Sequence, residues 1–153
     1  MSLKKARRSD LNKIYDICTQ FEGITQIYPA DILRTTLIKY IDEGTVIYDR
    51  GIIIVYSYFG TTQKLPFDYE TFPEDVLISI VVNENPGNGL ADIVMDEFLA
   101  SVSSDVYSAS LNDNKWITQR LIRRGYKKLW DGKVKVSGKF RNISIWKETE
   151  RVN

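Results

Sequence analysis

The sequence predicts an α/β or α+β domain with a mixed central sheet, and three observations support this fold class. The 153 residues are 43% hydrophobic, which is enough to bury one globular core. Helical and strand patterns alternate along the chain in the order β-α-α-β-β-β-α-β-α-β-β. A helical pattern joins the apolar runs at 76–83 and 105–111, which favours a parallel pair of strands. Because no internal repeat or low-complexity linker interrupts this order, we expect a single domain over residues 1–153.

The N-terminal part predicts two helices after a short extended piece near residues 3–6. Ser9 or Asp10 can cap the first helix. Its apolar residues recur at helical spacing: Leu11, Ile14, Tyr15, Cys18 and Phe21. Pro29 introduces a second helix and Gly44 ends it. The apolar side of the second helix consists of Leu33, Leu37, Tyr40 and Ile41.

The middle of the chain predicts a β-hairpin, an irregular segment, and a strand followed by a helix. The run TVIYDRGIIIVYSYF places two β-rich stretches on either side of residues 49–51, which is typical of a hairpin. The stretch 60–73 is rich in turn residues, and DVLISIVVN then predicts a buried strand at 76–83. We expect the next helix to cover about residues 88–101.

The C-terminal part predicts a strand, a helix and a closing pair of strands. The run DVYSASL is the strand at 105–111, and NKWITQRLIRR is a helix that Gly125 ends. The runs YKKLWDGKVKV and KFRNISIWKE have the alternation of two neighbouring strands. These elements complete the predicted order.

The composition excludes several kinds of chemistry. Histidine is absent, which removes Ser-His-Asp and Cys-His catalysis and most zinc sites. The single cysteine, Cys18, lies in a helical apolar pattern, so we expect a buried structural thiol and no internal disulfide. There is no apolar run of about 18 residues and no signal-peptide pattern at the N-terminus. We therefore expect a cytoplasmic protein without a membrane segment.

Basic side chains are concentrated in the C-terminal third. Residues 1–110 carry 9 basic and 16 acidic side chains, whereas residues 111–153 carry 12 and 4. An anion would therefore bind in the C-terminal third, although a solvated helix face and a lysine-protected edge strand explain the same charges. A nucleic-acid surface is one further interpretation. Its aromatic residues, which are more often core or strand partners, would be Trp116, Tyr126, Trp130 and Trp146.

The stretch NENPGNGLADIVMDEF joins the strand at 76–83 to the next helix and places Gly87 and Gly89 at the junction. The first N–H groups of a helix are unpaired and, together with the helix dipole, suit anions such as phosphate. The amides of such a cradle belong to Asn88, Gly89, Leu90 and Ala91. Glycines also permit a tight turn that binds nothing, so both interpretations stay open.

The order of elements and three stretches resemble the GCN5-related N-acetyltransferase (GNAT) family. ARRSDLNKIYDIC is similar to the family's opening strand and helix, and ISIVVNENPGNGLADIVMDEF looks like its strand, pyrophosphate loop and helix. NDNKWITQRLIRRGY is similar to a late motif in which an Asn precedes a Gly and an aromatic residue, here Asn114, Gly125 and Tyr126. The resemblance implies a mixed sheet flanked by helices and the transfer of an acetyl group from acetyl-CoA to an amine on a small molecule or a protein.

The resemblance also implies which residues hold the cofactor. The strands at 76–83 and 105–111 would separate at their C-terminal ends and admit the pantetheine arm. A backbone N–H near Val82 would polarise the thioester carbonyl. Residues 87–91 would hold the pyrophosphate through their amides. Asn114 would contact pantetheine, although its position equally suits a helix cap.

The catalytic residues are less well defined, because the chain departs from the family at two positions. Glu84 replaces the usual Arg or Gln and would repel a pyrophosphate, and Leu121 replaces the Tyr that protonates the leaving thiolate. A base could be Glu84 or Asp105 acting through water, and Tyr107 or Ser108 could replace the missing acid.

A second hypothesis is a GNAT-shaped protein used for binding or assembly, without acetyltransferase activity. Bacteriophage genomes encode small divergent domains of this shape, and this chain resembles them. Their cofactor motif is often eroded. The ending RLIRRGYKKLWDGKVKVSGKFRNISIWKE is similar to their helix-Gly-aromatic-hairpin tail. Fold alone does not decide between the two hypotheses.

Overall fold

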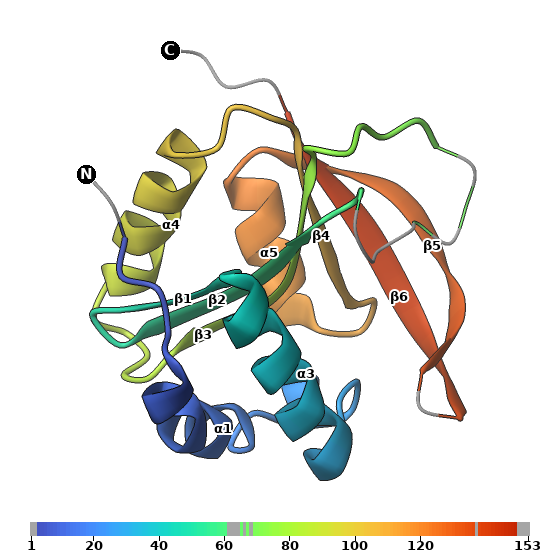
Figure 1. Ribbon diagram of the computed structural model, residues 1–153. Coiled ribbons are helices and arrows are strands. Elements are labelled where there is room, and N and C mark those ends of the chain that lie inside the picture. The colour runs from blue at the N-terminus through green and yellow to red at the C-terminus, as the bar shows by residue number, and fades with distance from the viewer. Residues whose placement is uncertain (1–2, 61–64, 66, 68, 137, 150–153) are drawn as a thin grey trace. The chain divides into compact units, whose positions relative to one another are not determined.

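The computed structural model describes residues 3–60, 65, 67, 69–136 and 138–149, and Figure 1 traces the chain through them. The helices are η1 (Arg8–Asp10, a 3-10 helix), α1 (Leu11–Cys18), α2 (Glu22–Thr25), α3 (Ala30–Glu43), α4 (Leu90–Ala100) and α5 (Lys115–Arg123). The strands are β1 (Val46–Asp49), β2 (Ile52–Tyr58), β3 (Val76–Asn83), β4 (Val106–Leu111), β5 (Tyr126–Val136) and β6 (Lys139–Glu148).

The six strands form one mixed sheet in the order β1-β2-β3-β4-β6-β5. β1 and β2 are the antiparallel arms of a hairpin, and β6 pairs antiparallel with both β4 and β5. β3 and β4 are parallel neighbours, as the helix between them predicted. The predicted fold class, a mixed sheet flanked by helices, is therefore confirmed.

Two compact units can be distinguished by their internal contacts. The first unit comprises Met1–Tyr56 and Ile80–Ser103, and the second comprises Ser57–Ser79 and Ser104–Asn153. The first unit contains α1 to α4 and β1, and the second contains β4, α5, β5 and β6. β2 and β3 contribute residues to both units.

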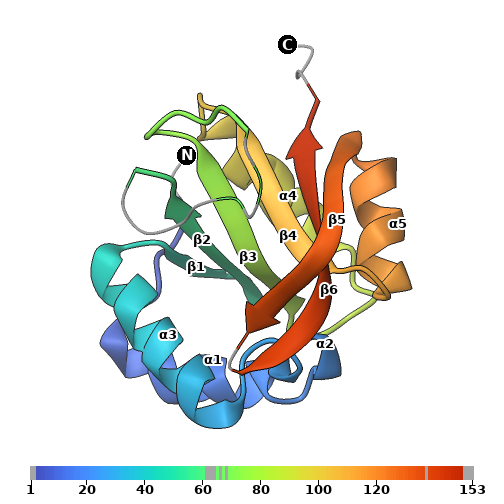
Figure 2. The same cartoon turned by 90° about the vertical axis from the view of Figure 1, so that its right-hand side faces the viewer.

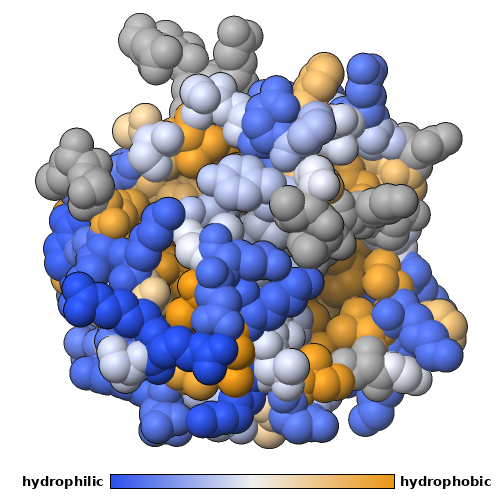
Figure 3. Space-filling model, viewed as in Figure 1, coloured by the Kyte–Doolittle hydropathy of each residue, from blue (hydrophilic) through white to orange (hydrophobic). Residues whose placement is uncertain are grey.

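In the first unit, β2 is covered on both faces, and six of its seven residues are buried. Ile53 and Val55 belong to a core shared with α1 and α3. Other members of this core are Leu11, Ile14, Leu33, Leu37 and Val46. The neighbouring Tyr56 packs on Phe98 of α4, with ring centroids 4.9 Å apart. Because alternate strand residues point to opposite faces, α4 covers the face opposite to α1 and α3 (Figure 1), and the outward side of α3 is hydrophilic (Figure 3).

In the second unit, α5 packs on one face of β5 and β6. Leu121 of α5 forms a buried cluster with Tyr126 and Trp146. Lys147 follows Trp146 in β6 and is the cross-strand partner of Tyr107, so these two side chains lie on the other face. Figure 2 shows β5 and β6 side by side, with α5 next to them.

The N-terminal part differs from the prediction in two ways. The extended piece near residues 3–6 forms only an isolated bridge, Lys5 to Ile47, because η1 starts at Arg8 and cuts the extended piece short. The short helix α2 was not predicted. It contains no buried residue, so it lacks the apolar spacing by which a helix is recognised in a sequence.

The helix expected over residues 88–101 begins at Leu90, two residues later than predicted. Gly89 has φ +75°, outside the helical region, and serves as the N-cap. The irregular segment expected at 60–73 lies partly outside the described residues. Its described members belong to no helix or strand.

Candidate functional site

The candidate site starts at the β3–α4 loop, residues 84–89, which two asparagines shape. Asn83 Oδ1 accepts a hydrogen bond from the Asn85 amide at 2.9 Å, and Asn83 Nδ2 donates to Asn88 Oδ1 at 2.9 Å. The same Asn88 oxygen accepts from the Leu90 amide at 3.1 Å. One of the four amides predicted for an anion cradle therefore has a partner inside the loop, and a phosphate would compete with Asn88 for it.

The two glycines of this loop are required by backbone conformation. Gly87 and Gly89 have φ values of +92° and +75°, a region that favours glycine. A Cβ built on either residue would meet nothing within 4 Å among the described residues. Leu90 and Ala91 then begin α4, whose positive dipole end lies at this exposed loop. The geometry is that of a tight turn, and anion binding at the turn stays a prediction.

Glu84, the first residue of the loop, is held from two sides. Its amide donates to the Gly51 carbonyl at 2.8 Å, and its carboxylate lies 3.6 Å from Lys13 Nζ of α1. A Cβ on Gly51 would come 3.1 Å from Glu84 Oε2, so glycine leaves room for the carboxylate. Tyr48 and then Glu84 raise the pKa of Lys13. The charged Lys13 therefore partly balances Glu84, which weakens the repulsion of an anion expected from the sequence.

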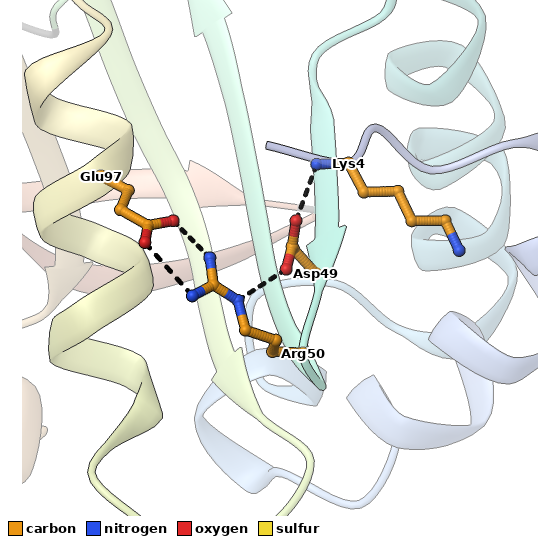
Figure 4. A network of polar contacts seen from close by, with 4 residues as sticks. All are labelled: Lys4, Asp49, Arg50 and Glu97. Carbon is orange, nitrogen blue, oxygen red and sulfur yellow. Dashed lines mark hydrogen bonds and ion pairs between the residues drawn. The ribbon is translucent and has the colours of Figure 1, made fainter. Parts of the chain in front are cut away.

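The turn between β1 and β2 carries a polar network that reaches α4 (Figure 4). Arg50 donates to both carboxylate oxygens of Glu97, one of them at 3.2 Å, and donates to Asp49 at 2.7 Å. Asp49 also accepts from the Lys4 amide at 2.8 Å. Arg50 has φ +50° and Gly51 has φ +80°, so both residues of the turn are left-handed. Asn, Asp and Gly are preferred in such a turn, so the contacts of the Arg50 side chain offset a backbone cost.

The hairpin tip, residues 49–51, thus contacts both Glu84 at the start of the β3–α4 loop and Glu97 in α4. The turn could be predicted from the sequence, but these contacts could not, because Arg50 and Glu97 are 47 residues apart in the chain. An arginine at a turn position that favours Asn or Gly was the available signal.

β3 and β4 pair over only part of their length. The parallel ladder joins residues 76–78 to residues 106–108, although β3 continues to Asn83 and β4 to Leu111. Residues 80–83 of β3 belong to the first unit and β4 belongs to the second, so separation of the two strands at their C-terminal ends stays a prediction.

Three residues near the end of this ladder have different surroundings. The Val82 side chain is buried in the core of the first unit, so only its backbone is available to a ligand. Ser108 is the last residue of β4 that pairs with β3, and it lies opposite Trp146 of β6. Ser110 is 6% exposed, and its hydroxyl has no hydrogen-bond partner among the described residues. An unsatisfied buried hydroxyl costs about 1–3 kcal/mol. Sequence analysis did not single out Ser110, because serine within a strand carries no special signal.

Tyr107, a candidate acid, lies in an aromatic cluster of the second unit. Its ring centroid is 5.2 Å from that of Phe59 and 6.1 Å from that of Tyr69. Lys147 Nζ lies 5.6 Å from the Tyr107 ring centre. Burial is the main cause that raises the pKa of Tyr107, so the phenol keeps its proton at neutral pH. Tyr107 and Ser108 are adjacent in a strand and point to opposite faces, so the structure does not bring the two candidate acids together.

Asn114 and Leu121 have structural roles in α5. Asn114 caps the helix, since its Oδ1 accepts a hydrogen bond from the Ile117 amide at 3.2 Å. The cap interpretation is confirmed, and contact with pantetheine stays a prediction. Leu121 is 9% exposed and packs with Ile117, Tyr126 and Trp146. Leu121 is therefore a core side chain at the position where the resemblance implies a general acid.

The described residues also bear on a reactive cysteine, a metal site and a membrane-spanning helix. Cys18 is fully buried in the first core, and burial raises the pKa of its thiol to about 12, which confirms a structural cysteine. Over the described ranges, no group of three or more Cys, Asp or Glu side chains is placed to hold a metal ion. None of the described helices has the length and apolar character to cross a membrane.

No protein-family model and no curated protein matches this sequence. Solved structures match along nearly the whole chain. A GNAT-family acetyltransferase from Bacillus cereus matches with a TM-score of 0.61 at 16% identity, with 98% of each chain covered. Ard1 from Thermoplasma volcanium matches with a TM-score of 0.66 at 14% identity, over 97% of this chain and 98% of that one.

A third match is Arabidopsis thaliana NAA60, solved in complex with acetyl-CoA. Its TM-score is 0.60 at 11% identity, over 95% of this chain and 96% of that one. At these identities the likeness concerns the fold. The chain therefore has the GNAT fold, which the resemblance of its sequence motifs implied.

Proposed function

We propose that this protein is an N-acetyltransferase that moves an acetyl group from acetyl-CoA to an amine. The observation that carries the proposal is the end of the parallel β3–β4 ladder at residues 78 and 108 of the second unit. In the proposal, an extended ligand with amide groups pairs with strand backbone beyond this ladder as another strand would. The pantetheine arm of acetyl-CoA is such a ligand. The GNAT fold supports the same function by analogy.

In the proposed reaction a neutral amine attacks the thioester carbonyl carbon. A C–N bond forms and the C–S bond breaks, so the electron pair leaves on the thiolate, which takes up a proton while the amine loses one. A backbone N–H near Val82 stabilises the carbonyl oxygen as negative charge develops on it. Holding both reactants in place supplies much of the rate, so few side chains are needed.

The phosphates of the cofactor have a candidate place at the β3–α4 loop. Gly87, Asn88, Gly89 and Ala91 would offer amides, the Leu90 amide would exchange its bond to Asn88 for one to phosphate, and the α4 dipole adds attraction for an anion. Asn114 would contact the pantetheine arm through the donor of its side-chain amide, because its oxygen caps α5.

Proton transfer has three candidates in this proposal. Glu84 would accept the amine proton through water, and its carboxylate lies 3.6 Å from Lys13 Nζ. Either Tyr107 or Ser108 would protonate the thiolate, but not both, because they point to opposite faces of β4. Tyr107→Phe and Ser108→Ala separate them, since only the variant that lacks the true acid should lose turnover.

A second candidate function is ligand binding or assembly without acetyl transfer. The burial of Leu121 favours it, because a core side chain stands where GNAT enzymes place a general acid. Such a protein would bind acetyl-CoA or a partner and release no acetylated product. In this second candidate, the protein would be one of the bacteriophage-encoded domains that its C-terminal part resembles.

Calorimetry with acetyl-CoA, followed by mass spectrometry of amines incubated with the protein, tests both candidates. We expect a dissociation constant on the order of 100 μM, because the loop lacks the Arg or Gln donor. Binding together with an acetylated amine supports the transferase, and binding without product over small amines and peptide N-termini supports the second candidate. If wild-type protein does not bind acetyl-CoA, the proposed function is wrong.

A further inference from the structure

β5 and β6 form a strongly basic two-stranded ribbon in the second unit. Residues 126–148 carry seven basic and two acidic side chains, while the whole chain has a net charge of only +1. The acid Asp131 is already bound by Lys128 Nζ at 2.9 Å and by the Ser144 hydroxyl. Little negative charge therefore remains to balance the lysines at the far end of the ribbon.

The strand register places lysines and an aromatic ring on one face of this ribbon. Lys133 lies opposite Asn142, and Lys135 lies opposite Phe140. These four residues alternate with their neighbours and share a face. Both lysines are exposed, and Phe140 is 67% exposed. The basic-aromatic face is defined as Lys133, Lys135 and Phe140.

The aromatic residues named from the sequence do not form this surface. Tyr126 and Trp146 are buried, and Trp130 is partly buried in a stacked aromatic pair. Trp116 alone among the four is an exposed aromatic side chain, at 55%. The alternative interpretation, that these aromatic residues are core or strand partners, therefore holds for three of the four, and Phe140 is the exposed ring on the ribbon.

Protection of an edge strand explains only part of this arrangement. β5 is the last strand of the sheet, and lysines on an edge strand discourage pairing with other chains. An exposed phenylalanine on the same face opposes that protection, because it adds apolar surface. A ring beside lysines is the combination that binds single-stranded nucleic acid, since lysines attract phosphates and a base stacks on the ring.

We propose that the basic-aromatic face binds single-stranded nucleic acid. Residues two apart in a strand are separated by about 6.6 Å, which resembles the spacing of successive phosphates in an extended single strand. Lys133 and Lys135 would therefore contact neighbouring phosphates, and Phe140 would stack on a base. An acidic peptide would use the same lysines but would gain nothing from base stacking, so Phe140 separates the two kinds of ligand.

Fluorescence anisotropy of a labelled oligothymidylate, titrated with the full chain over a series of salt concentrations, tests the proposal. We expect Lys133→Glu/Lys135→Glu to weaken binding at least about tenfold and to lower the salt slope by about 1.4, at about 0.7 per lost phosphate contact. Phe140→Ala should weaken binding about fivefold or more with the salt slope unchanged.

The matched control is Lys5→Glu/Lys39→Glu, which changes the net charge equally at two exposed lysines of the first unit. We expect this control to retain most of the binding. An equal loss in the control overturns the proposal, since net charge alone would then explain binding. Failure of wild-type protein to bind at low salt also overturns it. If Phe140→Ala bound the oligothymidylate as tightly as wild type, and polyglutamate competed for the protein as well as unlabelled oligothymidylate, the face would be assigned to an acidic protein instead. Circular dichroism of each variant confirms that it is folded.

Discussion

Leu121 shows how a single core residue bears on function. It packs with Ile117, Tyr126 and Trp146, at the position where the resemblance to the GNAT family implies a tyrosine. We expect Leu121→Tyr to lower the free energy of unfolding by about 1–3 kcal/mol, because the larger side chain must fit into a packed cluster. Urea unfolding measures this change. Leu121→Met, which nearly conserves volume, is the control and should cost less than about 1.5 kcal/mol.

A Leu121→Tyr protein of unchanged stability would contradict the core assignment. If that variant also acetylated an amine faster than wild type, Leu121 would line an acyl pocket and the transferase would be favoured over the binding protein. A general acid in the right place typically contributes about 10²–10⁴-fold in rate.

Cys18 predicts how stability depends on pH. Burial raises the pKa of its thiol to about 12, whereas an unfolded cysteine titrates near 8.5. Between these values the unfolded chain loses a proton that the folded chain keeps, so the thiol's stabilising contribution falls as pH rises. We expect the free energy of unfolding to decrease above about pH 8.5 more steeply in wild type than in Cys18→Ala, by up to about 1.4 kcal/mol per pH unit. Equal slopes in urea titrations would contradict burial of the thiol.

Ser110 and Ser144 are directly opposite each other on β4 and β6 and give opposite predictions. The Ser110 hydroxyl is buried without a partner among the described residues, whereas that of Ser144 donates to Asp131. We expect Ser110→Ala to leave stability unchanged or to raise it by up to about 1 kcal/mol, and Ser144→Ala to lower it by about 1 kcal/mol. Thermal unfolding of the two variants measures both. A loss in Ser110→Ala would indicate a hydrogen-bonded partner such as a buried water.

At the scale of elements, the hairpin tip links β1 and β2 to the segment that carries the candidate site. The hydrogen bonds of Arg50 to Glu97 and Asp49 offset the energetic cost of its left-handed backbone conformation. Arg50→Gly removes the bonds and the backbone cost, whereas Arg50→Ala removes only the bonds. We therefore expect stability to decrease from wild type to Arg50→Gly to Arg50→Ala. If Arg50→Gly were more stable than wild type in chemical denaturation, the network would not stabilise the hairpin.

Some elements of the fold could be predicted from the sequence and others could not. The hairpin, β3, α5 and the closing strands follow from turn residues and periodicity, which are local properties. α2 could not be found, because none of its four residues is buried. The start of α4 was misplaced by two residues, because Gly89 is compatible with a helix in a sequence pattern but has φ +75° in the fold.

At the scale of the whole molecule, the fold was predictable because the order of elements extends over most of the chain and the late Asn-Gly-aromatic motif lies in register with it. The candidate site was predictable only where it is local. The glycine turn and the Asn114 cap follow from neighbouring residues. The contacts of Glu84 with Lys13 and of Arg50 with Glu97 join residues distant in the sequence, so no local pattern contains them.

The contacts define two compact units where a single domain was expected, which raises the question of whether the chain unfolds cooperatively. β2 passes from the first unit to the second after Tyr56, and β3 passes from the second to the first after Ser79. Neither unit can lose its part of these strands without exposing backbone groups in the middle of a strand. We therefore expect one unfolding transition, with equal calorimetric and van't Hoff enthalpies of about 100 kcal/mol near 60 °C. Two transitions in differential scanning calorimetry, each with about half of that enthalpy, would instead make the units independent domains.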